Sequence, residues 1–354
     1  MKKSSIIAMV LGAAALVACS DWTTPESISI RVSSLENDYP EVYAQYCQQL
    51  RDYKASENHN LVYIAFDNQQ STANGSYRLT SLPDSVDVVE ISNPELIDGT
   101  LVDEMNKLRT DKGFKFALAF SFDDVKAEYD EVVDSIANAY LEEYDAIYEQ
   151  GGDPDSLPAP TYPEFDEVFK ESLAGVMKYV DEYGFDAVRV TYSDLYSRTH
   201  LTEKEDSAYV ADQKANFDVI LGEIGSRSGV GMYLNADAQY IASEDIIKAA
   251  ECIILPTESC AGTAEMAYMA LRASEVYPDA RLVFAVSATL PDDATLTTGY
   301  FTAGEQIPLA SKWVGSERSK SGLVIYNARN TFFDADRNVY SKLRAAIKNL
   351  NPNS

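Results

Sequence analysis

Short apolar runs alternate with helical patterns along most of the chain. Each run is rich in Val, Ile, Leu or aromatic residues, and the eight runs are 61–66, 86–92, 115–121, 187–193, 229–235, 252–257, 281–287 and 322–328. Such runs are typical of parallel strands that are buried on both faces. Helical patterns lie at 41–53, 101–110, 207–224, 264–276 and 337–350. This alternation predicts a single-domain α/β fold, a closed (β/α)8 (TIM) barrel. A doubly wound open sheet is the alternative, but no Gly-rich phosphate turn follows the first run.

The interval between the third and fourth runs is much longer than the others, and residues 124–163 are the additional segment. Apolar residues recur there every three or four positions, at Val125, Tyr129, Val132, Ile136, Tyr140, Tyr144 and Ile147. This spacing predicts a long amphipathic helix inserted after the third strand. We expect its tyrosines to serve in helix packing, with sugar stacking by one or two of them as the alternative.

The N-terminus has the pattern of a secretory signal. Lys2 and Lys3 precede the apolar stretch 6–16, which is too short to span a bilayer. The small residues before Cys19 resemble a bacterial lipobox, in which the thiol is acylated and the signal is cleaved before it. We therefore expect a signal peptide at 1–18, a tether at 19–37 and the barrel at 38–354. An ordinary soluble secretory signal is the alternative.

Charge and composition exclude several classes of function. The 354 residues include 56 acidic and 29 basic ones, giving a formal net charge of −27. This field repels phosphate backbones, so nucleic acid is not expected as a partner. The two histidines, His59 and His200, are both interpreted as solvated loop residues, and we expect neither a metal site nor a cofactor.

Three cysteines remain after Cys19, namely Cys47, Cys252 and Cys260. They allow at most one internal disulfide, and we interpret them as mostly buried small apolar residues.

The fourth run carries a family resemblance. Residues 183–193 read YGFDAVRVTYS, which resembles the signature strand of family 18 glycoside hydrolases, the chitinases and endo-β-N-acetylglucosaminidases. In that pattern Gly-Phe-Asp-Gly precedes three carboxylates at alternate positions, and the last is the catalytic Glu. The frame matches at Gly184, Phe185 and Asp186, with Ala187 in place of the second Gly. With segments 82–87 and 115–124, the resemblance covers about residues 38–350 and points to the lipoprotein branch common in gut Bacteroidetes.

The departure from the family pattern bears on catalysis. The resemblance implies substrate-assisted hydrolysis, in which a Glu protonates the glycosidic oxygen and an Asp orients the acetamido group. A strand's period of two places positions 189, 191 and 193 on one face. These positions hold Arg189, Thr191 and Ser193, none of which can replace a general acid worth about 10²–10⁴-fold in rate. The sequence therefore predicts a catalytically degenerate barrel.

Other residues bear on this prediction. Asp194 points to the opposite face of its strand unless a bulge intervenes, whereas Glu258 and Asp237 are candidates for a relocated acid. A buried Arg189 needs a carboxylate partner, for which Glu90 and Asp67 are the candidates.

The carboxyl ends of the strands form the binding face of such barrels. The candidate glycan-binding residues there are Asp67, Asn68, Phe122, Tyr192, Tyr196, Asn235, Asp237, Gln239, Glu258, Tyr326, Asn327 and Arg329. Amides, carboxylates and aromatic rings suit sugar hydroxyls and pyranose faces. The alternative for each polar residue is a helix cap or loop hydrogen bond, and for each aromatic residue a core contact.

These observations predict a lipoprotein of the bacterial outer membrane, facing the cell surface or the periplasm, that binds N-glycans or N-acetylglucosamine-containing oligosaccharides without hydrolysing them. Its membrane contact would be the lipid on Cys19 alone. By family analogy it would pass glycans to an endoglycosidase and an outer-membrane importer. One alternative is an active endo-β-N-acetylglucosaminidase or chitinase with a relocated acid. Another is a structural partner in an envelope complex that binds no sugar.

Overall fold

The computed structural model describes residues 33–56, 58–69, 74–193, 198–290, 295–313, 321–333 and 338–352. The chain divides into two compact units, residues 1–46 and 47–354. In the first, α2 (Leu35–Asp38) is capped by the Ser34 side chain, which accepts from the backbone N–H of Asn37. Helix α3 (Pro40–Lys54) begins in this unit and ends in the second.

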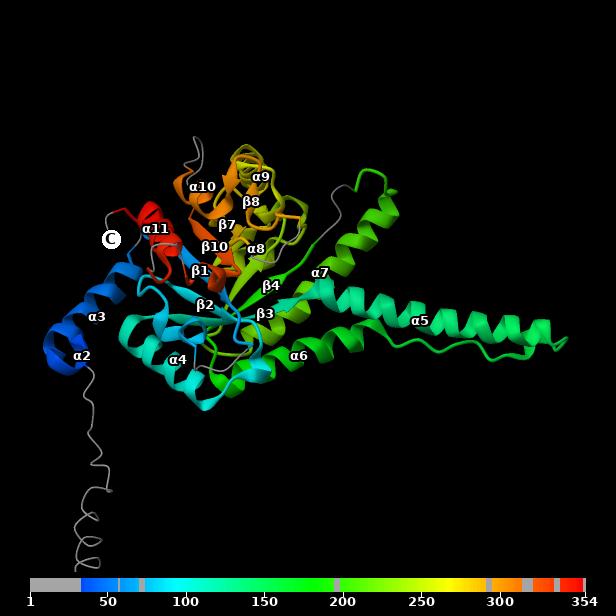
Figure 1. Cartoon of the computed structure of the whole chain (residues 1–354). Helices are drawn as coiled ribbons and strands as arrows, with labels where there is room; N and C mark the ends of the chain where they lie inside the picture. Colours follow the sequence, from blue (N-terminus) through cyan, green and yellow to red (C-terminus); the bar gives the residue numbers. More distant parts are fainter. Residues whose placement is uncertain are drawn as a thin grey trace, which may run out of the picture. The chain divides into compact units, whose positions relative to one another are not determined.

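The second unit is built on a closed barrel of eight parallel strands (Figure 1). The strands are β1 (Leu61–Phe66), β2 (Val88–Ile91), β3 (Lys115–Ser121), β4 (Ala187–Thr191), β5 (Gly231–Asn235), β6 (Cys252–Leu255), β7 (Leu282–Ser287) and β10 (Gly322–Tyr326). Each pairs with the next, and β10 closes the ring on β1. The predicted (β/α)8 barrel is confirmed.

Alternate strand residues fill the barrel interior. Tyr63 on β1 and Tyr233 on β5 meet edge to face, with ring centroids 5.4 Å apart. Small residues on other strands, among them Ala117, Ala187 and Ala285, leave room for these rings. A larger apolar cluster lies between the strands and the surrounding helices. Both faces of each strand are therefore buried, which explains why the strands appear in the sequence as continuous apolar runs.

Helices connect the strands. They are α4 (Gly99–Lys112), α6 (Phe165–Tyr183), α7 (Glu203–Gly225), α8 (Glu244–Ala249), α9 (Thr263–Val276), α10 (Gln306–Lys312) and α11 (Ser341–Leu350). Short 3-10 helices lie at Gly75–Tyr77, Leu79–Ser81, Pro94–Leu96, Pro154–Ser156, Ala238–Tyr240, Thr257–Ser259 and Ala328–Thr331, and β8 (Tyr300–Phe301) pairs with β9 (Gly304–Glu305). The predicted helices correspond to α3, α4, α7, α9 and α11, while α6, α8 and α10 are additional.

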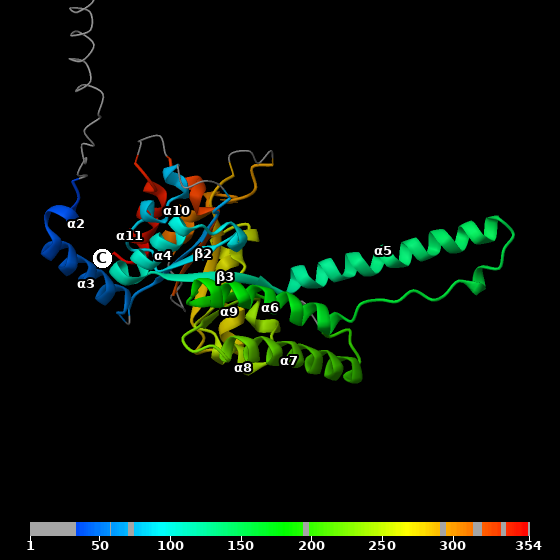
Figure 2. The same ribbon diagram turned by 90° about the horizontal axis from the view of Figure 1, so that it is seen from below.

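Helix α5 (Phe122–Glu149) follows β3 and extends away from the barrel, and the chain returns alongside it (Figure 2). Only Phe122 and Val125 of its 28 residues are buried. Tyr129 Oη donates to the carbonyl of Pro163 (3.1 Å), and Tyr144 Oη lies 3.4 Å from an Asp155 carboxylate oxygen. These tyrosines thus pack against the returning segment of the same insertion.

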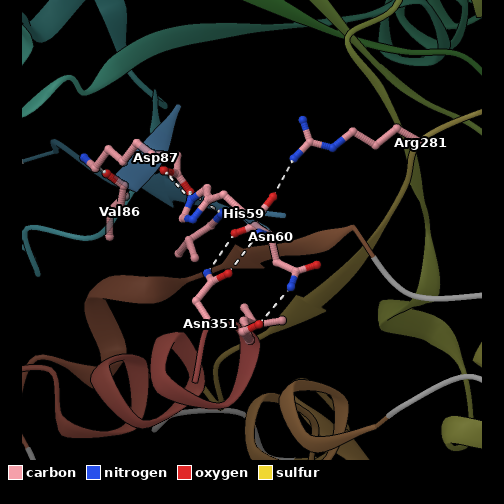
Figure 3. Close-up of polar contacts among 9 residues, drawn as sticks. His59, Asn60, Val86, Asp87, Arg281 and Asn351 are labelled. Carbon is pink, nitrogen blue, oxygen red and sulfur yellow. Dashed lines mark hydrogen bonds and ion pairs between the residues drawn. The ribbon is translucent and has the colours of Figure 1, made fainter. Parts of the chain in front are cut away.

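A polar network lies at the amino-terminal end of the barrel (Figure 3). His59 Nε2 lies 2.8 Å from both carboxylate oxygens of Asp87, which also accepts from the backbone N–H of Val62. Asn60 and Asn351 exchange two hydrogen bonds of 2.9 Å, which join β1 to the end of α11. His59 is therefore buried, and its interpretation as a solvated loop residue is wrong. This end of a barrel serves stability rather than ligand binding.

His200 is exposed, as predicted. Cys47, Cys252 and Cys260 are free and buried, which confirms their interpretation as small apolar residues. No helix in the described part of the chain is long and apolar enough to cross a membrane.

Candidate functional site

Four adjoining cavities lie at the carboxyl-terminal ends of the strands. The β5–β6 cavity (about 420 Å³) lies at the ends of β4, β5 and β6, and the β7–β10 cavity (about 530 Å³) at β6, β7 and β10. The β1–β2 cavity (about 410 Å³) borders β10, β1 and β2, and the α11 cavity (about 370 Å³) lies between the end of β7 and the start of α11. Neighbouring cavities share Glu258, Tyr326 and Ser287. Together they form one extended cleft.

The first of the three family carboxylate positions holds Arg189, which makes a two-pronged ion pair. Its Nε and Nη2 lie 2.5 and 3.0 Å from the two carboxylate oxygens of Glu90. Tyr63 Oη also donates to Glu90, at 2.6 Å. Burial lowers the pKa of Arg189, but Glu90, Tyr326 and Tyr63 together hold this pKa above its ordinary value. The prediction that Arg189 pairs with a carboxylate is confirmed, and the partner is Glu90.

The second position, Thr191, is part of the same network. Its Oγ1 accepts from Arg189 Nη1 at 2.6 Å and lies 3.4 Å from Asn235 Nδ2. Asn235 Nδ2 also lies 3.4 Å from Tyr326 Oη. The hydroxyl of Thr191 therefore connects a paired guanidinium to an amide, where the family resemblance implies a negative charge.

The third position, Ser193, lies at the mouth of the cleft and lines the β5–β6 cavity. Its backbone N–H donates to both carboxylate oxygens of Asp123, at 2.8 and 3.0 Å. Asp123 thus fixes the chain just after β4. Ser193 itself offers a hydroxyl, which cannot act as a general acid near neutral pH.

Two polar side chains of the β5–β6 cavity have buried oxygen atoms without a hydrogen-bond partner. They are Asn235 Oδ1 and Glu258 Oε2, and the Asn235 side chain belongs to a residue only 8% exposed. Burial raises the pKa of Glu258 and also that of Asp237. A buried acceptor without a donor is unfavourable. These atoms are therefore ready to accept hydrogen bonds from a ligand.

Most of the predicted binding residues meet in the cleft. Those that line one of the four cavities are Asp67, Asn235, Asp237, Glu258, Tyr326, Asn327 and Arg329. Arg329 Nη2 lies 3.0 Å from Asp67, and its guanidinium lies 4.3 Å from the centre of the Tyr77 ring. Asn327 donates to Ser287 Oγ at 2.9 Å. Some of these residues therefore also stabilise the loops around the cleft.

Two predicted aromatic contacts require correction. Tyr192 and Phe122 stack on each other with ring centroids 4.4 Å apart, and Tyr192 also lies 4.5 Å from the Phe217 ring. Both are buried in the layer between strands and helices. For Tyr192 the reason is strand parity, because residue 192 faces away from the barrel interior when 191 and 193 face it. Phe122 is the first residue of α5, and its ring packs edge to face on Phe165 and Phe169.

Three further candidates lie elsewhere. Asn68 exchanges hydrogen bonds of 2.7 and 2.8 Å with the backbone of Asn93, so its amide holds two loops together rather than a ligand. Gln239 lies in the 3-10 helix Ala238–Tyr240 and lines none of the four cavities. Tyr196 lies outside the described residues, as do Asp194 and Cys19.

Sequence reasoning missed several residues of the cleft. Tyr268 and Glu265 reach the β5–β6 cavity from α9, and Tyr268 is 61% exposed. Tyr300, on β8, lines the β7–β10 cavity. Exposed Phe333 borders the α11 cavity. The search for site residues at the carboxyl ends of the strands could not find them, because they come from a helix, a hairpin and a long loop.

A closed barrel with a polar cleft at the carboxyl ends of its strands belongs to the class of (β/α)8 proteins that build their sites from strand ends and loops. Residues 23–349 match the family model described as glycoside hydrolase family 18, BT1044-like. The chain belongs to this family.

Solved structures share the fold. The selenomethionine form of a Glu-to-Gln variant of BT1044 has a TM-score of 0.57 at 15% identity, covering 91% of this chain and 96% of that one. An endo-β-N-acetylglucosaminidase from Cordyceps militaris has a TM-score of 0.53 at 15% identity, covering 87% and 96%. A mutant of the Cordyceps enzyme, in complex with fucosyl-N-acetylglucosamine-Asn, has a TM-score of 0.55 at 15% identity, covering 86% and 95%. No curated protein sequence matches this chain.

Proposed function

We propose that this protein binds glycans, N-glycans or other N-acetylglucosamine-containing oligosaccharides, in the cleft at the carboxyl end of its barrel and does not hydrolyse them by the family mechanism. The observation that carries the proposal is the Arg189–Glu90 ion pair with Thr191 hydrogen-bonded to it. A neutralised guanidinium and a hydroxyl stand where the mechanism needs acids. The cavities and their exposed aromatic rings remain available for sugars.

A relative offers support. The Cordyceps militaris complex holds its glycan in a mutant with an Asp and a Glu, two positions apart, changed to Asn and Gln. A barrel of this fold can thus hold a glycan without that pair of acids, as we propose for this chain with Thr191 and Ser193.

Calorimetry and a glycan array test the binding. Asn235→Ala is expected to weaken glycan binding by about tenfold or more, because it removes the central amide of the cleft. Tyr144→Phe, in the insertion outside the cleft, serves as the control and should leave affinity unchanged. Absence of binding to N-glycans and chitin fragments would favour a structural role in an envelope complex instead.

A second candidate is hydrolysis with Glu258 as a relocated acid. Its buried position in the cleft raises the pKa of Glu258, a shift in the direction that general-acid catalysis requires. A release assay on N-glycoproteins and chitin oligosaccharides decides between the two. A binder gives no product over many equivalents of substrate, whereas turnover abolished by Glu258→Gln would establish the enzyme.

The cellular setting is part of the proposal and follows from the lipobox-like segment. Acylation of Cys19 would anchor the protein in the bacterial outer membrane, where it would deliver glycans to an endoglycosidase and an importer. Labelling with a fatty-acid analogue, and its loss in Cys19→Ser, tests the anchor. Membrane fractionation tests the location.

A further inference from the structure

The β5–β6 cavity is strongly anionic. Asp237, Glu258 and Glu265 line it, and no Lys or Arg is among its lining residues in the described part of the chain. Arg189 lies nearby, but its charge is already compensated by Glu90. A ligand group that enters this cavity therefore meets uncompensated negative charge.

Two buried oxygen atoms make the cavity more than an acidic surface. Asn235 lines the cavity and is only 8% exposed. Its Oδ1 atom is buried and accepts no hydrogen bond. Glu258 Oε2 is also buried and unpartnered. Both atoms are acceptors, so a ligand group with several N–H donors can satisfy them.

A metal ion fits this arrangement poorly. Among the described residues, no group of three or more His, Cys, Asp or Glu side chains is placed to hold one. Glu265 Oε2 already accepts from the backbone N–H of Ala261 at 2.7 Å. An ammonium group, with three donors and one positive charge, fits better.

We propose that the β5–β6 cavity binds the protonated primary amine of an amino sugar, so that the cleft prefers glycans containing glucosamine over those containing only N-acetylglucosamine. The inference deepens the proposed function and depends on it. Asn235 Oδ1 and the Glu258 carboxylate accept from the ammonium, and Asp237 adds to the negative charge. Tyr268 is exposed at the rim, where its ring can pack on the face of the pyranose.

The test is calorimetry with the full chain and two hexasaccharides that differ only in acetylation, one of glucosamine and one of N-acetylglucosamine. The glucosamine oligomer is expected to bind about tenfold or more tightly, and its affinity should fall with added salt because a charge pair is formed. Glu258→Gln and Asp237→Asn should each weaken glucosamine binding by about fivefold or more and should lower the preference for the glucosamine oligomer over the acetylated one. Glu142→Gln, on exposed α5, makes the same charge change outside the cleft and is the matched control.

The outcomes separate the two proposals. Equal or tighter binding of the acetylated oligomer overturns the amine site and leaves the proposed glycan binding intact. Binding of neither oligomer, nor of any arrayed glycan, overturns both. Equal losses in Glu142→Gln and Glu258→Gln would assign the preference to the overall charge of the protein and also overturn the amine site.

Discussion

The guanidinium of Arg189 and the carboxylate of Glu90 face each other across the barrel interior, joined by contacts of 2.5 and 3.0 Å. Their side chains are 12% and 5% exposed, respectively. Arg189 comes from β4 and Glu90 from β2, two strands separated by β3. The Glu90 carboxylate thus neutralises Arg189, a cation that the family pattern does not contain.

The pair leads to a prediction on stability. Arg189→Met leaves Glu90 buried without its cation and should lower the free energy of unfolding by about 3–5 kcal/mol. The double variant Arg189→Met with Glu90→Gln should lose clearly less, because no charge remains uncompensated. Urea unfolding of wild type, Glu90→Gln, Arg189→Met and the double variant measures this. Additive losses in the four-way cycle would contradict the coupling.

The different locations of Tyr192 and Tyr268 lead to a second prediction. Tyr192→Ala removes a ring stacked in the core and should cost about 3–5 kcal/mol of stability. Tyr268→Ala removes a ring that is 61% exposed, so it should change stability by at most about 0.5 kcal/mol. It should nevertheless weaken glycan binding by roughly 5–30-fold, because a sugar-stacking platform is lost. Calorimetry and urea unfolding on both variants separate the roles, and unchanged affinity in Tyr268→Ala would exclude the platform.

The fold could be predicted from the sequence because its signal is local. Each strand is buried on both faces, so it appears in the sequence as a continuous apolar run. Such a run can be identified without knowing which strands pair with it. Strand parity likewise placed Arg189, Thr191 and Ser193 on the interior face. The same parity puts Tyr192 on the opposite face, and treating it as a cleft residue ignored that rule.

The rest of the site depends on distant parts of the chain. Tyr268 lies on α9 and lines the cleft together with residues from the ends of β5 and β6, a proximity that no local pattern reveals. His59 is buried because Asp87, 28 residues away, accepts its hydrogen bond. In both cases tertiary packing determines exposure, and a single sequence carries little information about it.

Glu258 leads to a prediction on pH. Burial raises its pKa in the folded state, so its contribution to stability is fully present below the ordinary Glu pKa and is lost as the pH rises through the raised value. Glu258→Gln should therefore gain stability relative to wild type as the pH rises from about 4 to about 7. Urea unfolding at both pH values measures the difference. A constant difference would show that this carboxyl titrates normally.

The insertion leads to a prediction on modularity. Beyond Val125, the described residues of α5 are not buried, and its tyrosines pack on the returning segment. Tyr129 also packs edge to face on Phe165 of α6, so it is kept. Replacing residues 130–160 by a short Gly-Ser linker should therefore change the stability of the barrel by no more than about 1 kcal/mol. Glycan affinity should also stay the same. Thermal unfolding and calorimetry check both, and a barrel that fails to fold without the insertion would contradict its independence.

Lys54, at the end of α3, leads to the last prediction. Its Nζ donates to the carbonyl of Val86 at 2.5 Å and lies 3.9 Å from the centre of the Phe114 ring. Burial lowers the pKa of Lys54 from 10.5 to about 8, although Asp87 and Asp84 oppose the shift. The unfavourable burial of the charge is fully present below the folded pKa and disappears as the pH rises towards the unfolded value. The free energy of unfolding therefore falls as the pH is lowered from the unfolded pKa to about 8, where the buried amine becomes protonated.

Lys54→Met keeps the length of the side chain and removes its titration. Between about pH 7.5 and about pH 9.5, wild type should gain about 2 kcal/mol of unfolding free energy relative to this variant. The upper limit stays below the range in which exposed tyrosines ionise. Urea unfolding of both proteins at the two pH values is the measurement, and Lys248→Met, on the surface of α8, is the control that should show no such gain. Parallel curves for wild type and Lys54→Met would mean that the buried amine keeps its ordinary pKa, and that Val86 and the nearby carboxylates compensate its burial fully.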